Sequence, residues 1–167
     1  MRLVVCDTGP FLHLSEVDCL DLLDLAGTVA IPGAVAEEMD LHIPAWGLNR
    51  PDWIRIQTLS PEAADQAAAW EAAGMLHSGE AESLALARQA GCDWYLTDDA
   101  AARIFASSLG LEVHGIIGIL LWAAASEFVA RPEAELLLDR LASESSLWVS
   151  PRVVVEAKSA LDELYLK

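Results

Sequence analysis

Short apolar runs alternate along this chain with longer stretches in which apolar residues recur at helical spacing. The short runs predict β-strands, because they are brief, are rich in β-branched and aromatic residues, and are followed by acids, glycine or proline. We expect these strands at residues 3–6, 28–31, 53–59, 94–97 and 112–114.

Helices are expected between the strands, where glycine and proline mark starts and ends. One helix opens near Gly9 and Pro10, and the spacing of apolar residues from Val17 onward predicts helix up to Gly27. Residues 41–52 are rich in proline, glycine and asparagine and predict an irregular loop. The remaining helices are expected at residues 32–39, 61–73, 78–90, 100–109, 115–128, 132–141 and 151–164.

The alternation of strands and helices predicts an α/β fold, in which helices cover both faces of a parallel sheet. In such sheets ligands bind beyond the carboxyl ends of the strands. Asp7 directly follows the first expected strand, and Asp98 and Asp99 follow the strand at residues 94–97. If these two strands are neighbours, their acids converge at one edge of the sheet.

Acidic residues strongly outnumber basic ones. The chain has 26 Asp and Glu against 10 Lys and Arg, which gives a formal net charge of −16. Hydrophobic residues make up 54% and charged residues 22%, a balance that excludes a disordered chain. The net charge repels phosphate backbones and anionic membranes and favours cations or basic partners.

The composition also predicts a cytoplasmic protein without a membrane segment. The longest apolar run, residues 116–125, is about half of the roughly 20 residues that a span needs. The apolar run at residues 3–6 is too short for a signal peptide. Cys6, Cys19 and Cys92 lack CxxC spacing and are typical of reduced thiols, and no paired Cys/His spacing indicates a zinc site.

Four acidic positions could form a cation site together. Clustered carboxylates raise one another's pKa, and a divalent cation removes that penalty. Oxygen ligands favour Mg²⁺ or Mn²⁺ over zinc. Each acid also has a plain structural interpretation as a helix cap or a solvated helix face. The four positions are Asp7, Glu37 or Glu38, Glu80 or Glu82, and Asp98 or Asp99.

The residues around these acids resemble the motifs of PIN domains. Residues 4–10 (VVCDTGP) resemble the opening strand of that family, and residues 31–39 resemble its second acidic motif. Residues 79–87 resemble the third motif and residues 96–103 the fourth. In order and spacing the motifs are most similar to the bacterial and archaeal branch related to VapC-type toxins.

The resemblance implies a three-layer α/β/α fold with a mainly parallel central sheet. It places one domain over residues 1–167, with the acidic core in about 1–125 and C-terminal helices in about 126–167. It also implies a Mg²⁺- or Mn²⁺-dependent endoribonuclease that leaves 5′-phosphate and 3′-hydroxyl ends. For that branch the implied role is the toxin of a toxin–antitoxin pair, with RNA as substrate, a small basic antitoxin as partner, and a homodimer.

The resemblance assigns a role to each matching residue. Thr8 would support Asp7 or contact the scissile bond, and Thr97 would be a further supporting residue. Arg103, one helical turn after Asp99, would orient a carboxylate or touch a phosphate. The catalytic acids would be Asp7, Glu38, Glu80, Asp98 and Asp99. The metal ligands would be Asp7, Glu80, Asp98 and Asp99.

Two other α/β folds, receiver domains and haloacid-dehalogenase-like phosphatases, also place acids at strand ends. Both need a lysine near the acids, but the only lysines here are Lys158 and Lys167. The phosphatase pattern also needs an acid where this chain has Gly9. These two classes are therefore disfavoured.

The alternative to an endoribonuclease is a catalytically weak or inactive PIN-like module that binds a protein partner. Residues 1–84 contain only three basic residues, although nucleic-acid binders usually have a basic surface. Trp46, in the expected loop, is the best candidate for an exposed tryptophan that stacks on a base. An RNA path would have to follow Arg88, Arg103, Arg131, Arg140 or Arg152.

Overall fold

The computed structural model describes residues 1–166. Within this range the chain forms one sheet of five strands, in the order β3-β2-β1-β4-β5, and every neighbouring pair is parallel. The strands are β1 (Leu3–Cys6), β2 (Thr28–Ile31), β3 (Ile54–Ile56), β4 (Trp94–Leu96) and β5 (Val113–His114). The expected strands are therefore all present, although three are shorter than predicted.

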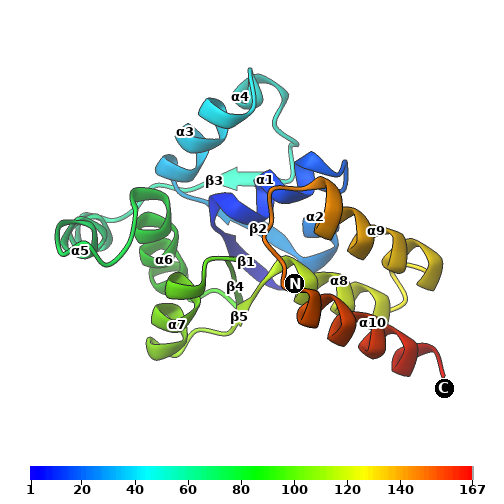
Figure 1. Ribbon diagram of the computed structural model, residues 1–167. Coiled ribbons are helices and arrows are strands. Elements are labelled where there is room, and N and C mark those ends of the chain that lie inside the picture. The colour runs from blue at the N-terminus through cyan, green and yellow to red at the C-terminus, as the bar shows by residue number, and fades with distance from the viewer. Residues whose placement is uncertain (167) are drawn as a thin grey trace.

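Helices cover both faces of the sheet. Figure 1 shows α5, α6 and α7 on one side and α1, α2, α8, α9 and α10 on the other. This is the predicted three-layer α/β/α fold. No helix within residues 1–166 is both long enough and apolar enough to cross a membrane. The helices are α1 (Thr8–Glu16), α2 (Leu22–Ala26), α3 (Gly33–His42), α4 (Trp46–Asn49), α5 (Pro61–Ala72), α6 (Ser78–Ala90), α7 (Ala100–Ser108), α8 (Ile116–Ala125), α9 (Arg131–Glu144) and α10 (Pro151–Tyr165).

Alternate side chains of the central strands enter two separate cores, because successive strand residues point to opposite faces. Val4 and Cys6 of β1 pack with α1, α2, α8 and the two C-terminal helices. Val5 and Tyr95 pack with α5, α6 and α7. Burial on both faces explains why β1 is an uninterrupted apolar run up to its last residue.

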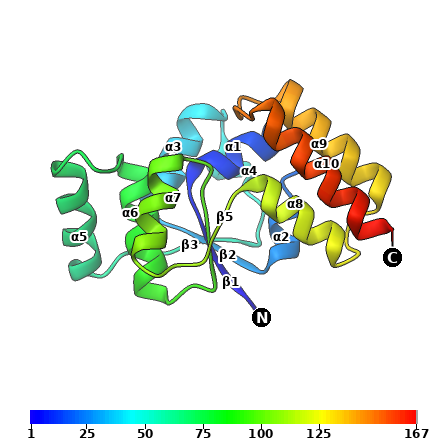
Figure 2. The ribbon, with the colours of Figure 1, turned by 60° about the horizontal axis from the view of Figure 1, so that its bottom comes forward.

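The strand order of the sheet changes direction between β1 and β4, which makes this the topological switch point. From β1 the chain adds β2 and β3 on one side, and then returns to add β4 and β5 on the other. β1 and β4 are direct neighbours, with Val5 paired to Tyr95 and Cys6 to Leu96. In Figure 2, β1 rises from the N label and α1 follows at its upper end, so the carboxyl ends of the parallel strands share that edge. Asp7 and the acids after β4 therefore meet at the switch point.

Two expectations about local structure were wrong. The helix expected up to Gly27 is in fact two helices. α1 ends at Glu16, and Asp18 takes a left-handed φ of 52° before α2 begins. The expected loop at residues 41–52 contains α4, whose Trp46 is only 4% exposed. Trp46 is therefore a packing residue and not an exposed platform for a base.

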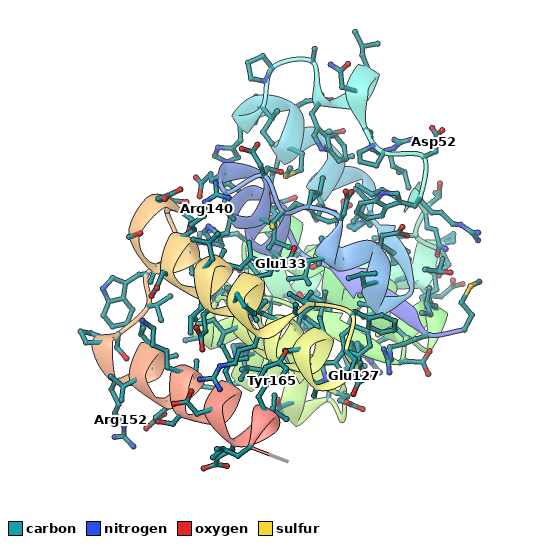
Figure 3. The ribbon with its side chains drawn as sticks, turned by 90° about the vertical axis from the view of Figure 1, so that its right-hand side faces the viewer. Asp52, Glu127, Glu133, Arg140, Arg152 and Tyr165 are labelled. Carbon is teal, nitrogen blue, oxygen red and sulfur yellow. The ribbon has the colours of Figure 1, made fainter. Side chains whose placement is uncertain are left out.

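Helices α9 and α10 pack against each other as an antiparallel hairpin at the end of the chain. Figure 3 shows this pair, with Arg140 near the end of α9 and Arg152 projecting from the first turn of α10. Charged side chains join the two helices: Arg131 pairs with Asp162 at 2.5 Å and Lys158 pairs with Asp139 at 2.7 Å. The hairpin is therefore held on its outer side by exposed ion pairs.

Candidate active site

Asp7 is a buried acid at the end of the central strand. Its side chain is 5% exposed and forms the N-cap of α1: Oδ1 accepts a hydrogen bond from the Thr8 N–H at 2.7 Å. The Thr97 hydroxyl donates to Oδ2 at 3.1 Å. Burial, together with the charges of Glu80 and Glu38, outweighs these hydrogen bonds and raises the pKa of Asp7 from 3.8 to about 7. Asp7 therefore lies among neutral donors that hold its position without removing the cost of its charge.

Glu38 reaches the same site from α3. The Thr8 hydroxyl donates a short hydrogen bond to its Oε2, and the Gly79 N–H donates to its Oε1 at 3.0 Å. A Cβ atom on Gly79 would lie 2.5 to 2.7 Å from the Glu38 carboxylate, so the close approach requires glycine at this position. Glu37 is exposed. Of this pair of acids, Glu38 is the one that faces the site.

Glu80 lies in the first turn of α6. Its Oε2 accepts a hydrogen bond from the His77 N–H at 2.9 Å and completes a capping box. Glu82 instead accepts from the Ala34 N–H at 3.0 Å, at the start of α3. Glu80 therefore faces the site, whereas Glu82 satisfies the amino end of a neighbouring helix.

A buried pair of hydroxyl groups fixes the turn of α6 that carries Glu80. Ser83 Oγ lies 2.9 Å from Tyr95 Oη, and it donates to the Glu80 carbonyl oxygen at 3.1 Å. Ser83 and Tyr95 are both fully buried. This contact ties α6 to β4 directly beside the acids, so it sets the distance of Glu80 from the sheet.

The two acids after β4 point in different directions. Asp99 is exposed and is the N-cap of α7, with Oδ1 accepting from the Ala102 N–H at 2.7 Å. Asp98 Oδ1 accepts from the Ile116 N–H of α8 at 2.9 Å, and within residues 1–166 its buried Oδ2 has no hydrogen-bond partner. Burial raises the pKa of Asp98, although Ile116, His13 and Arg103 partly offset this effect. Asp98 is thus the more buried of the two acids, and Asp99 is the more exposed.

Thr97 and Arg103 lie where they can support these acids. Thr97 is fully buried, and its hydroxyl, which donates to Asp7, also accepts from the Asp99 N–H at 3.3 Å. Arg103 Nη1 donates to the Thr97 carbonyl oxygen at 3.3 Å. Thr97 therefore links Asp7 to the loop that carries Asp98 and Asp99.

All five predicted acids line one cavity of about 520 Å³ at the carboxyl edge of the sheet. They come from four places in the sequence that only the fold brings together. Several other lining residues were not predicted. The complete lining is Asp7, Thr8, Gly9, His13, Glu38, His77, Glu80, Asp98, Asp99, Ala100, Leu147 and Trp148.

The histidines and the C-terminal residues of this cavity were missed for different reasons. His13 lies one helical turn after Gly9, so its place on the same face of α1 could have been inferred from spacing. His77 directly precedes the helix that carries Glu80. No local signal connects Leu147 and Trp148 with acids more than forty residues earlier in the chain, because only the packing of the α9–α10 hairpin brings them there.

The donor set of the cavity suits a hard divalent cation. Its acids offer only carboxylate oxygens, the pKa of Asp7 is raised partly by the charges of neighbouring acids, and Asp98 Oδ2 is buried without a partner among the described residues. As the side chains lie, however, residues 1–166 contain no group of three His, Cys, Asp or Glu residues that could hold an ion. The donor chemistry of the site fits a hard divalent cation, and in this arrangement each acid accepts a hydrogen bond from a backbone N–H group.

A family model described as a PIN domain matches residues 3–163. The chain belongs to the PIN-domain family. A search of curated proteins gave no match to this chain. PIN domains are generally nucleases, so this PIN domain has a fold of nuclease type, as expected from its acidic motifs. The match extends through α9 and into the last turns of α10, well past the acidic motifs.

Proposed function

We propose that this PIN domain is a divalent-cation-dependent endoribonuclease that hydrolyses RNA phosphodiester bonds. The observation that carries the proposal is the convergence of Asp7, Glu38 and Glu80 from three separate elements onto one cavity. Burying carboxylates together is costly unless they bind something positive. RNA is the proposed substrate because the motifs resemble those of toxin ribonucleases.

The acids that would hold the cation are Asp7, Glu80, Asp98 and Asp99. A bound Mg²⁺ or Mn²⁺ would lower the pKa of a bound water molecule and stabilise negative charge on the phosphoryl group. Asp99 is the exposed member of its pair and lines the cavity, so we give it the larger part in this role. Asp98, bonded to the first turn of α8, would mainly hold the loop after β4 in place.

The remaining polar residues would position the acids. Thr8 donates to Glu38 through its hydroxyl and to Asp7 through its backbone, so a single residue orients two carboxylates. Without a cation, Asp7 has a pKa of about 7 and is partly protonated at neutral pH, whereas a bound cation would favour its charged form. Arg103 lies beside the cavity, where its guanidinium could contact a phosphate of the bound strand.

An RNA cleavage assay tests the proposal. With Mn²⁺, the wild-type protein should cleave single-stranded RNA and leave 5′-phosphate and 3′-hydroxyl ends. Asp7→Asn should reduce the rate on the order of 10³-fold and remain folded. Glu38→Gln and Glu37→Gln form a matched pair, because only Glu38 faces the cavity. Unchanged cleavage by Asp7→Asn, or equal loss in both glutamine variants, would refute the assignment.

A second candidate function is a weak or inactive PIN module that binds a protein partner, such as a small basic antitoxin. It is favoured by the net charge of −16 and by the hydrogen bonds that already engage the acids. Added Mn²⁺ separates the two functions. A cation site gains thermal stability by mass action, whereas a scaffold without one does not respond.

A further inference from the structure

The loop between α9 and α10 is hydrogen-bonded to α1, the helix that begins at the acidic site. Glu16 Oε2, near the end of α1, accepts hydrogen bonds from the Ser146 N–H at 2.7 Å and from its hydroxyl at 3.0 Å. His13 Nδ1 lies 3.1 Å from the same hydroxyl. In Figure 3 this loop joins the end of α9 near Arg140 to the start of α10 near Arg152. These bonds fix the position of the two residues that follow, Leu147 and Trp148.

Trp148 differs from every other tryptophan of the chain in its exposure. Its side chain is 84% exposed, whereas the other five are buried or half-buried. A large exposed indole on a fastened loop is unusual, because tryptophan normally buries its ring in a core or an interface. The exposed ring is therefore available to a ligand.

Trp148 also lies between two cavities. With Leu147 it lines the acidic cavity, and both residues line a second cavity of about 380 Å³. Asp98 lines both cavities as well, so the two are adjacent. The second cavity combines apolar walls, from Val113, Ile117 and Val153, with the cationic side chain of Arg103.

Arg103 is one of the few basic groups near the acids that could receive an anion. Among the residues that the structure describes, it has no carboxylate within ion-pair distance, and the one hydrogen bond from its guanidinium goes to a backbone carbonyl. An apolar platform beside a cation suits a ligand that has a flat ring and a phosphate. A nucleotide of a single strand has both, whereas a base in a duplex is already paired and stacked.

We propose that Trp148 stacks on an unpaired nucleobase of the RNA strand and holds that strand between the acidic cavity and Arg103. This inference rests on the proposed nuclease function and adds its recognition step. It makes single-stranded RNA the preferred substrate. Little sequence preference is expected from this contact, since every base has a face that can stack.

The test is an affinity measurement that separates binding from cleavage. A short unstructured RNA is titrated into the wild type, Trp148→Ala and Trp148→Phe with Ca²⁺ in place of Mn²⁺, so that a cation that takes oxygen ligands offsets the charge of the acids, and indole emission is followed. Trp148→Ala should weaken binding about 5- to 100-fold, and Trp148→Phe by much less. RNA should quench an emission component that is present in the wild type and missing in Trp148→Phe.

Two controls make the result specific. An abasic strand of equal length should bind the wild type and Trp148→Ala equally, because only the base interacts with the ring. Phe128→Ala removes another exposed aromatic residue, which follows the far end of α8 and lines neither cavity, and should leave affinity unchanged.

The outcomes distinguish this inference from the function on which it rests. If the wild type cleaves RNA but Trp148→Ala binds it equally well, the stacking role is refuted and the nuclease stands. Equal weakening toward abasic RNA would also refute stacking. If the wild type neither binds nor cleaves RNA, both proposals fail, and Trp148 becomes a candidate contact for a protein partner.

Discussion

The acids of the cavity and the acids of the α9–α10 hairpin are the same residue types in opposite situations. In the hairpin, exposed carboxylates pair with arginine or lysine, as Glu156 does with Arg152 at 2.7 Å. In the cavity, Asp7, Glu38 and Glu80 are held by backbone N–H groups and hydroxyls. Within residues 1–166, every ion pair of an arginine or lysine with a carboxylate lies in the hairpin.

The difference shows how a strongly acidic chain can still form a specific cation site. Exposed ion pairs contribute little to stability and are easily replaced. Buried carboxylates that are held by neutral donors keep their geometry without being neutralised, so they retain a demand for positive charge. The net charge of −16 therefore includes a small group of acids that the fold gathers in one cavity, and only this group has the geometry of a site.

The largest effect should appear in the pH dependence of stability without metal. The folded state holds a proton on Asp7 up to its pKa of about 7, whereas the unfolded chain loses it near 3.8. The free energy of unfolding should therefore fall as pH rises through this window. The contribution of Asp7 is about 4 kcal/mol between pH 4 and pH 8, as an upper bound. Urea unfolding in EDTA at several pH values measures it.

Asp7→Asn is the control for this prediction, because asparagine cannot ionise. The variant should lose most of the fall and become more stable than the wild type at pH 8. Subtracting the two curves removes the titration of histidines and other acids that both proteins share. A variant with the same pH dependence as the wild type would show that Asp7 ionises in the fold without cost.

A smaller effect, on RNA cleavage, is expected when a substitution at another residue moves the Glu38 side chain out of position. In Gly79→Ala the new methyl group would meet the Glu38 carboxylate at about 2.5 Å, and this flexible end of a side chain can move away. The fold should survive, while the misplaced acid lowers RNA cleavage about 10²-fold. Gly33→Ala is the matched control in the first turn of α3, where a Cβ meets nothing within 4 Å.

The smallest effect belongs to the hairpin. Glu156→Gln removes the exposed ion pair with Arg152 and should change the free energy of unfolding by less than about 0.5 kcal/mol. Added salt should reduce even that difference, because exposed charges are screened. Denaturant unfolding at low and high salt measures the effect. A loss of several kcal/mol would erase the proposed distinction between the two groups of acids.

The fold could be predicted from the sequence to a large extent because its signals are local. A short apolar run such as residues 3–6 indicates a buried strand from its own composition. Ser60 and Pro61 indicate a helix start in the same way, because the Ser60 side chain caps the first turn and Pro61 suits its first position. The division of α1 from α2 could not be predicted in this way. Helical spacing continues across it, and the break at Asp18 depends on a backbone conformation that spacing does not report.

In the site, too, residues with a local sequence signal could be predicted, and residues placed only by tertiary packing could not. Asp7 could be predicted because an acid that closes a buried strand is costly, and its place at a strand end puts it at the ligand edge of the sheet. The choice of Glu38 over Glu37 was inferred from the resemblance to PIN domains, and the structure places Glu38 in the cavity. Trp46, expected to be exposed, is buried, and Trp148 is the exposed tryptophan, because tertiary packing sets the exposure of a tryptophan and its neighbours in sequence do not.

The central claim is that the cavity acids, and not the acidic surface as a whole, bind the cation. Isothermal titration of Mn²⁺ at pH 7.5 and physiological salt tests it in the wild type, Asp7→Asn and Glu156→Gln. We predict saturable binding in the wild type, loss of that binding in Asp7→Asn, and no change in Glu156→Gln. Equal binding by the wild type and Asp7→Asn, or equal weakening in both variants, would contradict the account.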